Sequence, residues 1–124
     1  MSKMQSQWMF LLDVADLVRF IEVNEYSAVG GELKRGHAEQ QRLYDLGLSK
    51  AKPGESRHQH LQAIDIEIFD EFGKWLKVPD NKDAQKEHRA KLQIFGDYWE
   101  SLDERNRWGG NWTFYDPNHF ERGK

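Results

Sequence analysis

Three side chains of the types that bind metal ions lie in two separate extended segments of the chain. His58 precedes a β-branched run, Asp65 lies within that run, and His119 lies in a second polar cluster near the C-terminus. Two histidines and one aspartate arranged in this way could converge on one ion. Catalytic zinc usually has three protein ligands, drawn from His and carboxylates, and keeps a fourth position for water. Because the chain contains no cysteine, thiolate metal sites are excluded.

The segment 63–69 has the alternating pattern of a β-strand. One face is apolar and consists of Ile64, Ile66 and Ile68. The other face consists of Ala63, Asp65, Glu67 and Phe69. A carboxylate in the middle of a β-branched run is costly to bury unless it has a partner. The pattern therefore predicts a strand with a core face and a face that presents Asp65 to a partner.

These residues resemble the motif of the M15 family of zinc peptidases, which reads Ser-x-His, six residues, Asp, and later Asp-x-x-His-Phe-Glu. The matching residues here are Ser56, His58, Asp65, Asp116, His119, Phe120 and Glu121. The likeness covers most of the chain, including Arg35, Gln40 and the run 107–110, Arg-Trp-Gly-Gly. It is strongest to the short bacteriophage members, which are L-alanyl-D-glutamate-type peptidases. One departure is Leu61, where many members have Gly.

The resemblance implies roles for several of these residues. The implied zinc ligands are His58, Asp65 and His119. It places the general base at Asp116, three residues before His119. It also implies that Arg35 binds substrate, where its fixed charge would hold a carboxylate or stabilise an oxyanion. Ser56 could bind substrate or orient His58, and it is a poor nucleophile because no separate His–acid pair accompanies it.

Several neighbouring residues keep more than one interpretation. His60 and His58 could face the same side of an extended chain. The motif assigns the metal to His58, which leaves His60 to line the cleft or support a ligand. Glu67 and Glu121 are acidic residues that could orient a ligand. Three aromatic residues near the C-terminal cluster could line a substrate groove, or belong to the core or to a lid, namely Trp108, Trp112 and Tyr115.

The spacing of apolar residues predicts two main helices. The first spans Phe10–Asn24, and the second starts at an Asp83 N-cap and ends near Leu102. The apolar stripe of the second helix consists of His88, Leu92, Phe95, Trp99 and Leu102, which makes His88 a packing residue. Between them we expect an extended segment at 26–35, a short helix at 38–46, a turn at 70–73 and a returning strand at 74–76.

This order of elements predicts an α+β fold with a small antiparallel sheet and packed helices. The resemblance implies a Hedgehog/DD-peptidase-like fold, that is, one shared by Hedgehog proteins and DD-peptidases. At 124 residues we expect one peptidase domain over 1–124, without a separate wall-binding domain, acting as a monomer. The net charge of −3 predicts that the chain binds neither nucleic acid nor an anionic membrane. The N-terminal residues lack a signal-peptide pattern, so we expect cytoplasmic synthesis and action on the wall after release.

The leading functional hypothesis is a zinc-dependent peptidoglycan peptidase of phage endolysin type that hydrolyses the L-Ala–D-Glu bond of the stem peptide. A rival within the family is a D-Ala-D-Ala carboxypeptidase or dipeptidase. A rival of another class is a non-catalytic module that holds zinc and binds a wall peptide or a protein. Asp116 argues against the module, because a structural site needs no base. A plain α+β domain would require the motif to be accidental.

Overall fold

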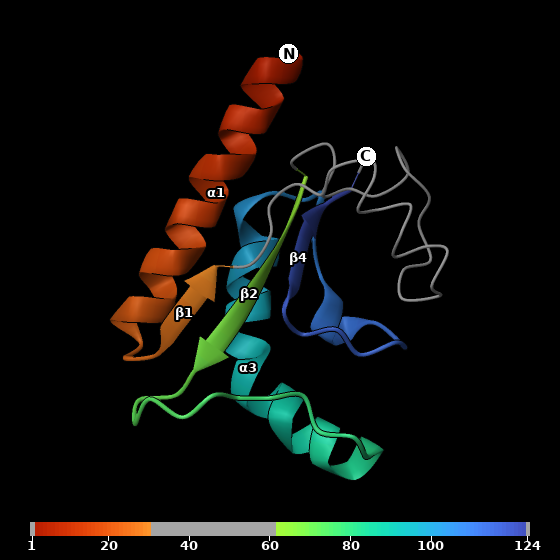
Figure 1. The fold of residues 1–124 in the computed structure, drawn as a ribbon. Coiled ribbons are helices and arrows are strands. Elements are labelled where there is room, and N and C mark those ends of the chain that lie inside the picture. Colours follow the sequence, from red (N-terminus) through yellow and green to blue (C-terminus); the bar gives the residue numbers. More distant parts are fainter. Residues whose placement is uncertain (1, 31–61, 124) are drawn as a thin grey trace, which may run out of the picture.

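The computed structural model describes residues 2–30 and 62–123, which form two long helices and a four-stranded antiparallel sheet (Figure 1). The elements are α1 (Lys3–Val23), β1 (Ser27–Gly30), β2 (Ala63–Phe69), α3 (Lys82–Leu102), β3 (Asn106–Trp108), a 3-10 turn η2 (Gly109–Asn111) and β4 (His119–Arg122). The predicted α+β class is confirmed. The predicted helix at 38–46 and four residues of interest, Arg35, Ser56, His58 and His60, lie outside the described residues.

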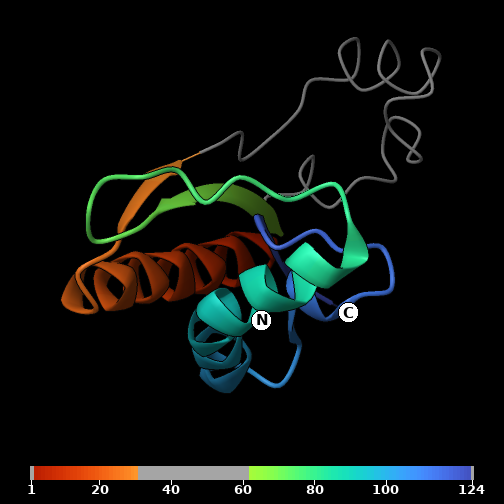
Figure 2. The same cartoon turned by 90° about the horizontal axis from the view of Figure 1, so that it is seen from below.

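The strands lie in the order β1-β2-β4-β3, so β2 and β4 are the two central strands. The three isoleucines of β2 are buried, as the alternation predicts. The helices α1 and α3 lie on that apolar face of the sheet (Figure 2). The opposite face of β2 carries Asp65 and Glu67, and β4 adds His119 and Glu121 to it. The sheet therefore has a core face and a polar face.

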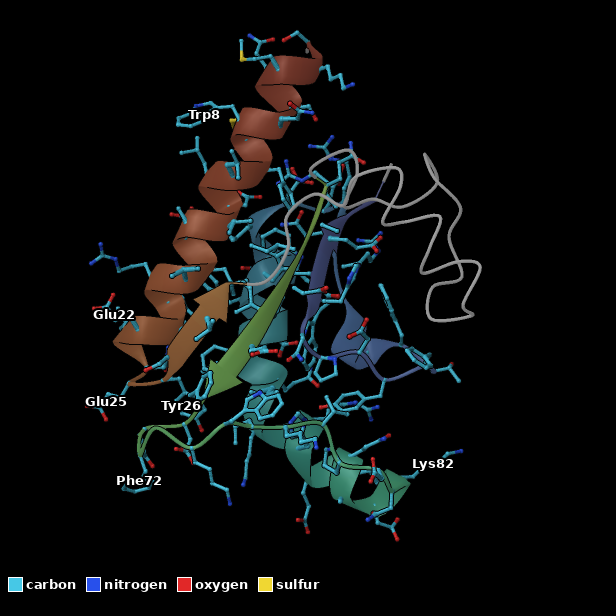
Figure 3. All side chains as sticks on the ribbon, in the orientation of Figure 1. Trp8, Glu22, Glu25, Tyr26, Phe72 and Lys82 are labelled. Atoms are coloured by element: carbon cyan, nitrogen blue, oxygen red, sulfur yellow. The ribbon has the colours of Figure 1, made fainter. Side chains whose placement is uncertain are left out.

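Helix α1 begins at Lys3, seven residues before the predicted start at Phe10. The reason is a capping box at Ser2. The Gln5 backbone N–H donates to Ser2 Oγ at 3.1 Å, and the Ser2 backbone N–H donates to Gln5 Oε1 at 2.9 Å. The buried face consists of Phe10, Val14, Leu17 and Ile21. Trp8 points away from the sheet (Figure 3).

Helix α3 is capped by Asn81 and not by Asp83 as predicted. The Ala84 N–H donates to Asn81 Oδ1 at 2.7 Å, and Asp83 instead lies in the first turn, where a negative charge favours the helix dipole. The helix ends at Leu102, as predicted. His88 is buried in the stripe, which confirms it as a packing residue.

The predicted turn after β2 is present. The Phe72 and Lys74 N–H groups both donate to Asp70 Oδ1 at 2.9 Å, and Gly73 has a φ of 77°. Phe72 projects from this turn and is exposed (Figure 3). The returning segment forms only one β-bridge, between Phe69 and Trp75, so the predicted strand at 74–76 is shorter than expected.

Trp99 of α3 lies at the centre of the core between the two helices and the sheet. Its ring makes edge contacts with Phe10 of α1 and Phe120 of β4, at centroid distances of 5.7 and 6.0 Å. Its indole N–H donates to the carbonyls of Arg107 and Glu121 at 3.2 and 3.1 Å. One side chain thus ties α3 to both C-terminal strands. Neither α1 nor α3, the long helices of the described chain, has a stretch apolar enough to cross a membrane.

An ion pair with a buried arginine joins α1 to β4. The Arg122 guanidinium, 3% exposed, contacts the Asp13 carboxylate and donates to Asn106 Oδ1 at 3.0 Å. Asn106 Nδ2 donates to Asp13 at 3.3 Å and to the Trp99 carbonyl at 2.9 Å. Burial raises the pKa of Asp13, while Asn106 and Arg122 act in the opposite direction. Each side chain of the pair therefore neutralises a charge whose burial is costly. Removal of either one would leave the other charge without its partner and destabilise the protein.

We expect Arg122→Ala to lower the free energy of unfolding by about 3–5 kcal/mol, because it leaves the Asp13 carboxylate without its guanidinium. Urea denaturation measures this. The exposed Arg19 of α1 supplies the control, Arg19→Ala, which should change stability by less than about 0.5 kcal/mol. The double variant Asp13→Leu/Arg122→Met should recover much of the loss. Equal stability of Arg122→Ala and wild type would contradict the role of the pair.

Candidate active site

Asp65 and His119 are direct cross-strand neighbours on the polar face of the sheet. His119 Nδ1 lies 3.3 Å from Asp65 Oδ1, and His119 Nε2 lies 2.8 Å from Glu121 Oε1. The imidazole therefore lies between two carboxylates that come from different strands. The side chains of His119 and Glu121 are only 12% and 17% exposed, whereas Asp65 is 35% exposed.

The two carboxylates control the protonation of His119. Burial by itself would lower the pKa of His119, but the hydrogen bonds and charges of Asp65 and Glu121 raise it to about 9. Two acids around one imidazole thus create a site that attracts a cation.

Asp116 lies in the loop that leads from η2 into β4. Its backbone carbonyl accepts the His119 N–H at 3.2 Å, so the two residues belong to one turn. Burial raises the pKa of the Asp116 carboxyl; the charge of His119 lowers it and that of Asp65 raises it. The structure therefore brings three predicted site residues together. A partly buried carboxyl with a raised pKa is suited to accept and return a proton.

The position of Asp116 depends on the backbone of Gly109. The Asp116 N–H donates to the Gly109 carbonyl at 3.0 Å. A Cβ atom at Gly109 would lie 2.2 Å from the Asp116 carbonyl oxygen. Any side chain at this position would displace the loop, so the close approach requires glycine.

Trp108 anchors the same loop from within the core. It is fully buried, and its indole N–H donates to the Pro117 carbonyl at 2.8 Å. Added Cβ atoms at Gly96 and Gly110 would lie 2.1 and 2.2 Å from its ring, so both glycines are needed to admit it. Of the interpretations of Trp108, the one that places it in the core is correct. Gly96 was not identified from the sequence, although a glycine inside a helical pattern is a signal of close packing.

The other two aromatic residues differ in their surroundings. Tyr115 is buried, and its hydroxyl lies 2.5 Å from His88 Nδ1. His88 Nε2 lies 2.8 Å from the Leu76 carbonyl, which can only accept, so His88 donates there and accepts from Tyr115. Trp112 instead packs against the His119 imidazole, with ring centroids 5.1 Å apart. Tyr115 thus belongs to the scaffold and Trp112 to the site.

The positions of Asp65 and His119 fit two ligands of one zinc ion. In a tetrahedral site with bonds of about 2.0–2.1 Å, two donor atoms lie about 3.3 Å apart. The observed separation of Oδ1 and Nδ1 is 3.3 Å, whereas a charged hydrogen bond would be about 2.7–2.9 Å. Residues 2–30 and 62–123 contain no group of three or more side chains able to hold a metal. The third predicted ligand, His58, lies outside them.

Comparison with known proteins identifies the family. A family model described as a D-alanyl-D-alanine carboxypeptidase of the M15 peptidases matches residues 49–122, which is more than half of the chain. The chain therefore belongs to the M15 peptidase family, as its motif predicts. No curated protein sequence matches it.

Two solved structures share the fold. The L-Ala D-Glu endopeptidase ChiX of Serratia marcescens has a TM-score of 0.54 and 23% identity, over 87% of this chain and 78% of that protein. The LD-carboxypeptidase LdcB has a TM-score of 0.52 and 15% identity, over 92% of this chain and 61% of that protein. At these identities the likeness shows the fold alone.

We expect Gly109→Ala to destabilise the protein by about 1–3 kcal/mol, because the new methyl group collides with the Asp116 backbone. Urea denaturation measures the loss. Gly30→Ala is the matched control, since a Cβ there meets nothing within 4 Å. A Gly109→Ala variant as stable as Gly30→Ala would show that the loop accommodates a side chain.

Burial raises the pKa of Tyr115 to about 12, although the charge of Arg89 acts in the opposite direction. An unfolded tyrosine ionises near pH 10. The stability that the protonated hydroxyl contributes is therefore complete below about pH 10 and is lost as the pH rises toward 12. We expect the free energy of unfolding of Tyr115→Phe to fall less steeply over this range. The comparison uses urea denaturation with Tyr98→Phe as control; equal slopes in all three proteins would contradict it.

Proposed function

We propose that the chain is a zinc-dependent peptidoglycan peptidase that hydrolyses the L-Ala–D-Glu bond of the stem peptide with a metal-activated water. The observation that carries this proposal is the Asp65–His119 pair, 3.3 Å apart, beside the partly buried carboxyl of Asp116. Membership of the M15 peptidases supports hydrolysis of a peptide. ChiX, which shares the fold, is an L-Ala D-Glu endopeptidase and supports the choice of bond.

Asp65 and His119 would hold the zinc together with His58. When bound, zinc supplies a Lewis acid and a water whose pKa is near 7. Asp116 accepts the proton of the attacking water and returns it to the leaving amine, a role for which its raised pKa suits it. Trp112 closes one side of the imidazole. Arg35 and Ser56 would bind the substrate, Arg35 through its charge.

The family description favours a second candidate, a D-Ala-D-Ala carboxypeptidase. The two activities share the metal, the base and the scaffold, and they differ in whether the substrate continues beyond the cleaved bond. The endopeptidase product carries a new D-Glu N-terminus, whereas the carboxypeptidase releases free D-Ala. We further propose that the single domain acts as a monomer, is made in the cytoplasm in the manner of a phage endolysin, and reaches the wall on release.

Product mass after incubation with purified peptidoglycan tests the proposal. We expect wild type to release fragments with a D-Glu N-terminus. Asp116→Asn, which keeps the shape but removes the base, should lower the rate about 100-fold or more. Chelation should abolish activity, and added zinc should restore it. Asp97→Asn, at an exposed acid of α3, is the control and should retain the wild-type rate.

Each other outcome has a definite meaning. Release of D-Ala alone would replace the endopeptidase with the carboxypeptidase. Full activity in the presence of a chelator would contradict the proposed zinc dependence. Zinc binding without any product from wall or stem peptides would favour the non-catalytic module.

A further inference from the structure

We propose that Glu121 is a positioning residue that fixes the orientation and the tautomer of His119, so that Nδ1 is the nitrogen presented to the metal. The inference rests on the zinc site of the proposed function and assigns a role within it. Its basis is the 2.8 Å contact between Glu121 Oε1 and His119 Nε2. Residues two apart in a strand share a face, so β4 places both side chains on the polar face of the sheet.

The chemistry of the contact determines which nitrogen carries a proton. An ionised carboxylate can only accept hydrogen bonds, so Nε2 of His119 must be the donor to Glu121. When Nε2 keeps its proton, the lone pair available to a metal is that of Nδ1. Nδ1 is also the nitrogen that lies 3.3 Å from Asp65 Oδ1. The contact with Glu121 and the position of Asp65 therefore select the same side of the ring for the metal.

The surroundings of Glu121 hold its carboxylate in place. Its backbone carbonyl accepts the Trp99 indole N–H at 3.1 Å, which anchors this part of β4 to the core. Its cross-strand neighbour on β2 is Ala63, which is buried. The Glu121 side chain is 17% exposed, so its hydrogen bond is little weakened by water. The Trp112 ring packs against the same imidazole and limits its rotation.

Glu67 provides a natural contrast to Glu121. Both are acids two residues from a predicted ligand on the polar face of the sheet. Glu67 is exposed, and its cross-strand neighbour is Val29 of the edge strand β1. Glu67 therefore carries the same charge on the same face of the sheet, two residues from Asp65. Comparing variants at the two positions therefore separates the effect of the hydrogen bond from the effect of net charge.

The test measures the zinc dissociation constant of the full chain by competition with a chromophoric chelator. We expect Glu121→Ala to weaken zinc binding by about 10–100-fold, the usual effect of losing a partner of a metal-bound histidine. Glu121→Gln keeps an acceptor oxygen at the same reach and should recover much of the affinity. Glu67→Gln should bind zinc as wild type does. Thermal unfolding of each metal-free variant checks that it folds.

A second readout is independent of affinity. Long-range proton–nitrogen NMR spectra of the zinc-loaded protein show which nitrogen of each histidine carries hydrogen. We expect His119 to carry hydrogen on Nε2 in wild type and in Glu121→Gln. In Glu121→Ala we expect exchange broadening or a second species.

The outcomes distinguish this inference from the proposed function. If wild type binds zinc and Glu121→Ala binds it equally well, the positioning role is wrong and the zinc peptidase stands. If Glu67→Gln loses as much affinity as Glu121→Ala, charge and not the hydrogen bond is responsible, and the inference is overturned. If wild type binds no zinc at all, both the inference and the proposed function fail.

Discussion

The antiparallel pairing of β2 with β4 is the constraint on which the candidate site depends. The register places Asp65 directly opposite His119, two residues that are 54 positions apart in the chain. Because side chains alternate along a strand, a slip of one residue would turn His119 into the core and separate it from Asp65. The same register buries the three isoleucines of β2, so hydrophobic burial and assembly of the site favour one arrangement.

The loop before β4 is held by close packing of backbone and ring. Trp108 enters the core between Gly96 of α3 and Gly110, and its indole N–H reaches the Pro117 carbonyl. Gly109 brings its own backbone against that of Asp116. The structural role of the Trp-Gly-Gly run is therefore to position Asp116. The run places the Asp116 carboxyl beside His119 through close contacts that a residue larger than glycine would prevent.

Polar groups in the interior connect the helices to this arrangement. The Asp13–Arg122 pair fixes α1 to the strand that carries His119, and the His88–Tyr115 hydrogen bond fixes α3 to the residue before Asp116. Such buried polar contacts are costly if any member is removed. The polar face of the sheet thus lies on a core with specific polar contacts, and these contacts can hold the candidate site residues in a defined geometry.

The sequence by itself determined the local patterns. Alternation identified β2, helical spacing identified the buried stripe of α3, and residue type with motif spacing identified Asp65, Asp116 and His119 as candidates. These properties depend on neighbours in the chain. The capping box of Ser2 and Gln5 is also a local pattern, but the prediction missed it and started α1 at Phe10.

Only the tertiary structure decided which distant residues meet. In the sequence, Glu67 and Glu121 are equivalent acids, each two residues from a candidate ligand, but only β4 brings its acid within 2.8 Å of the imidazole. Likewise Trp108 and Trp112 look alike, yet one fills the core and the other lies against His119. The physical reason is that strand register and packing act over long separations, whereas periodicity records only which face a residue occupies.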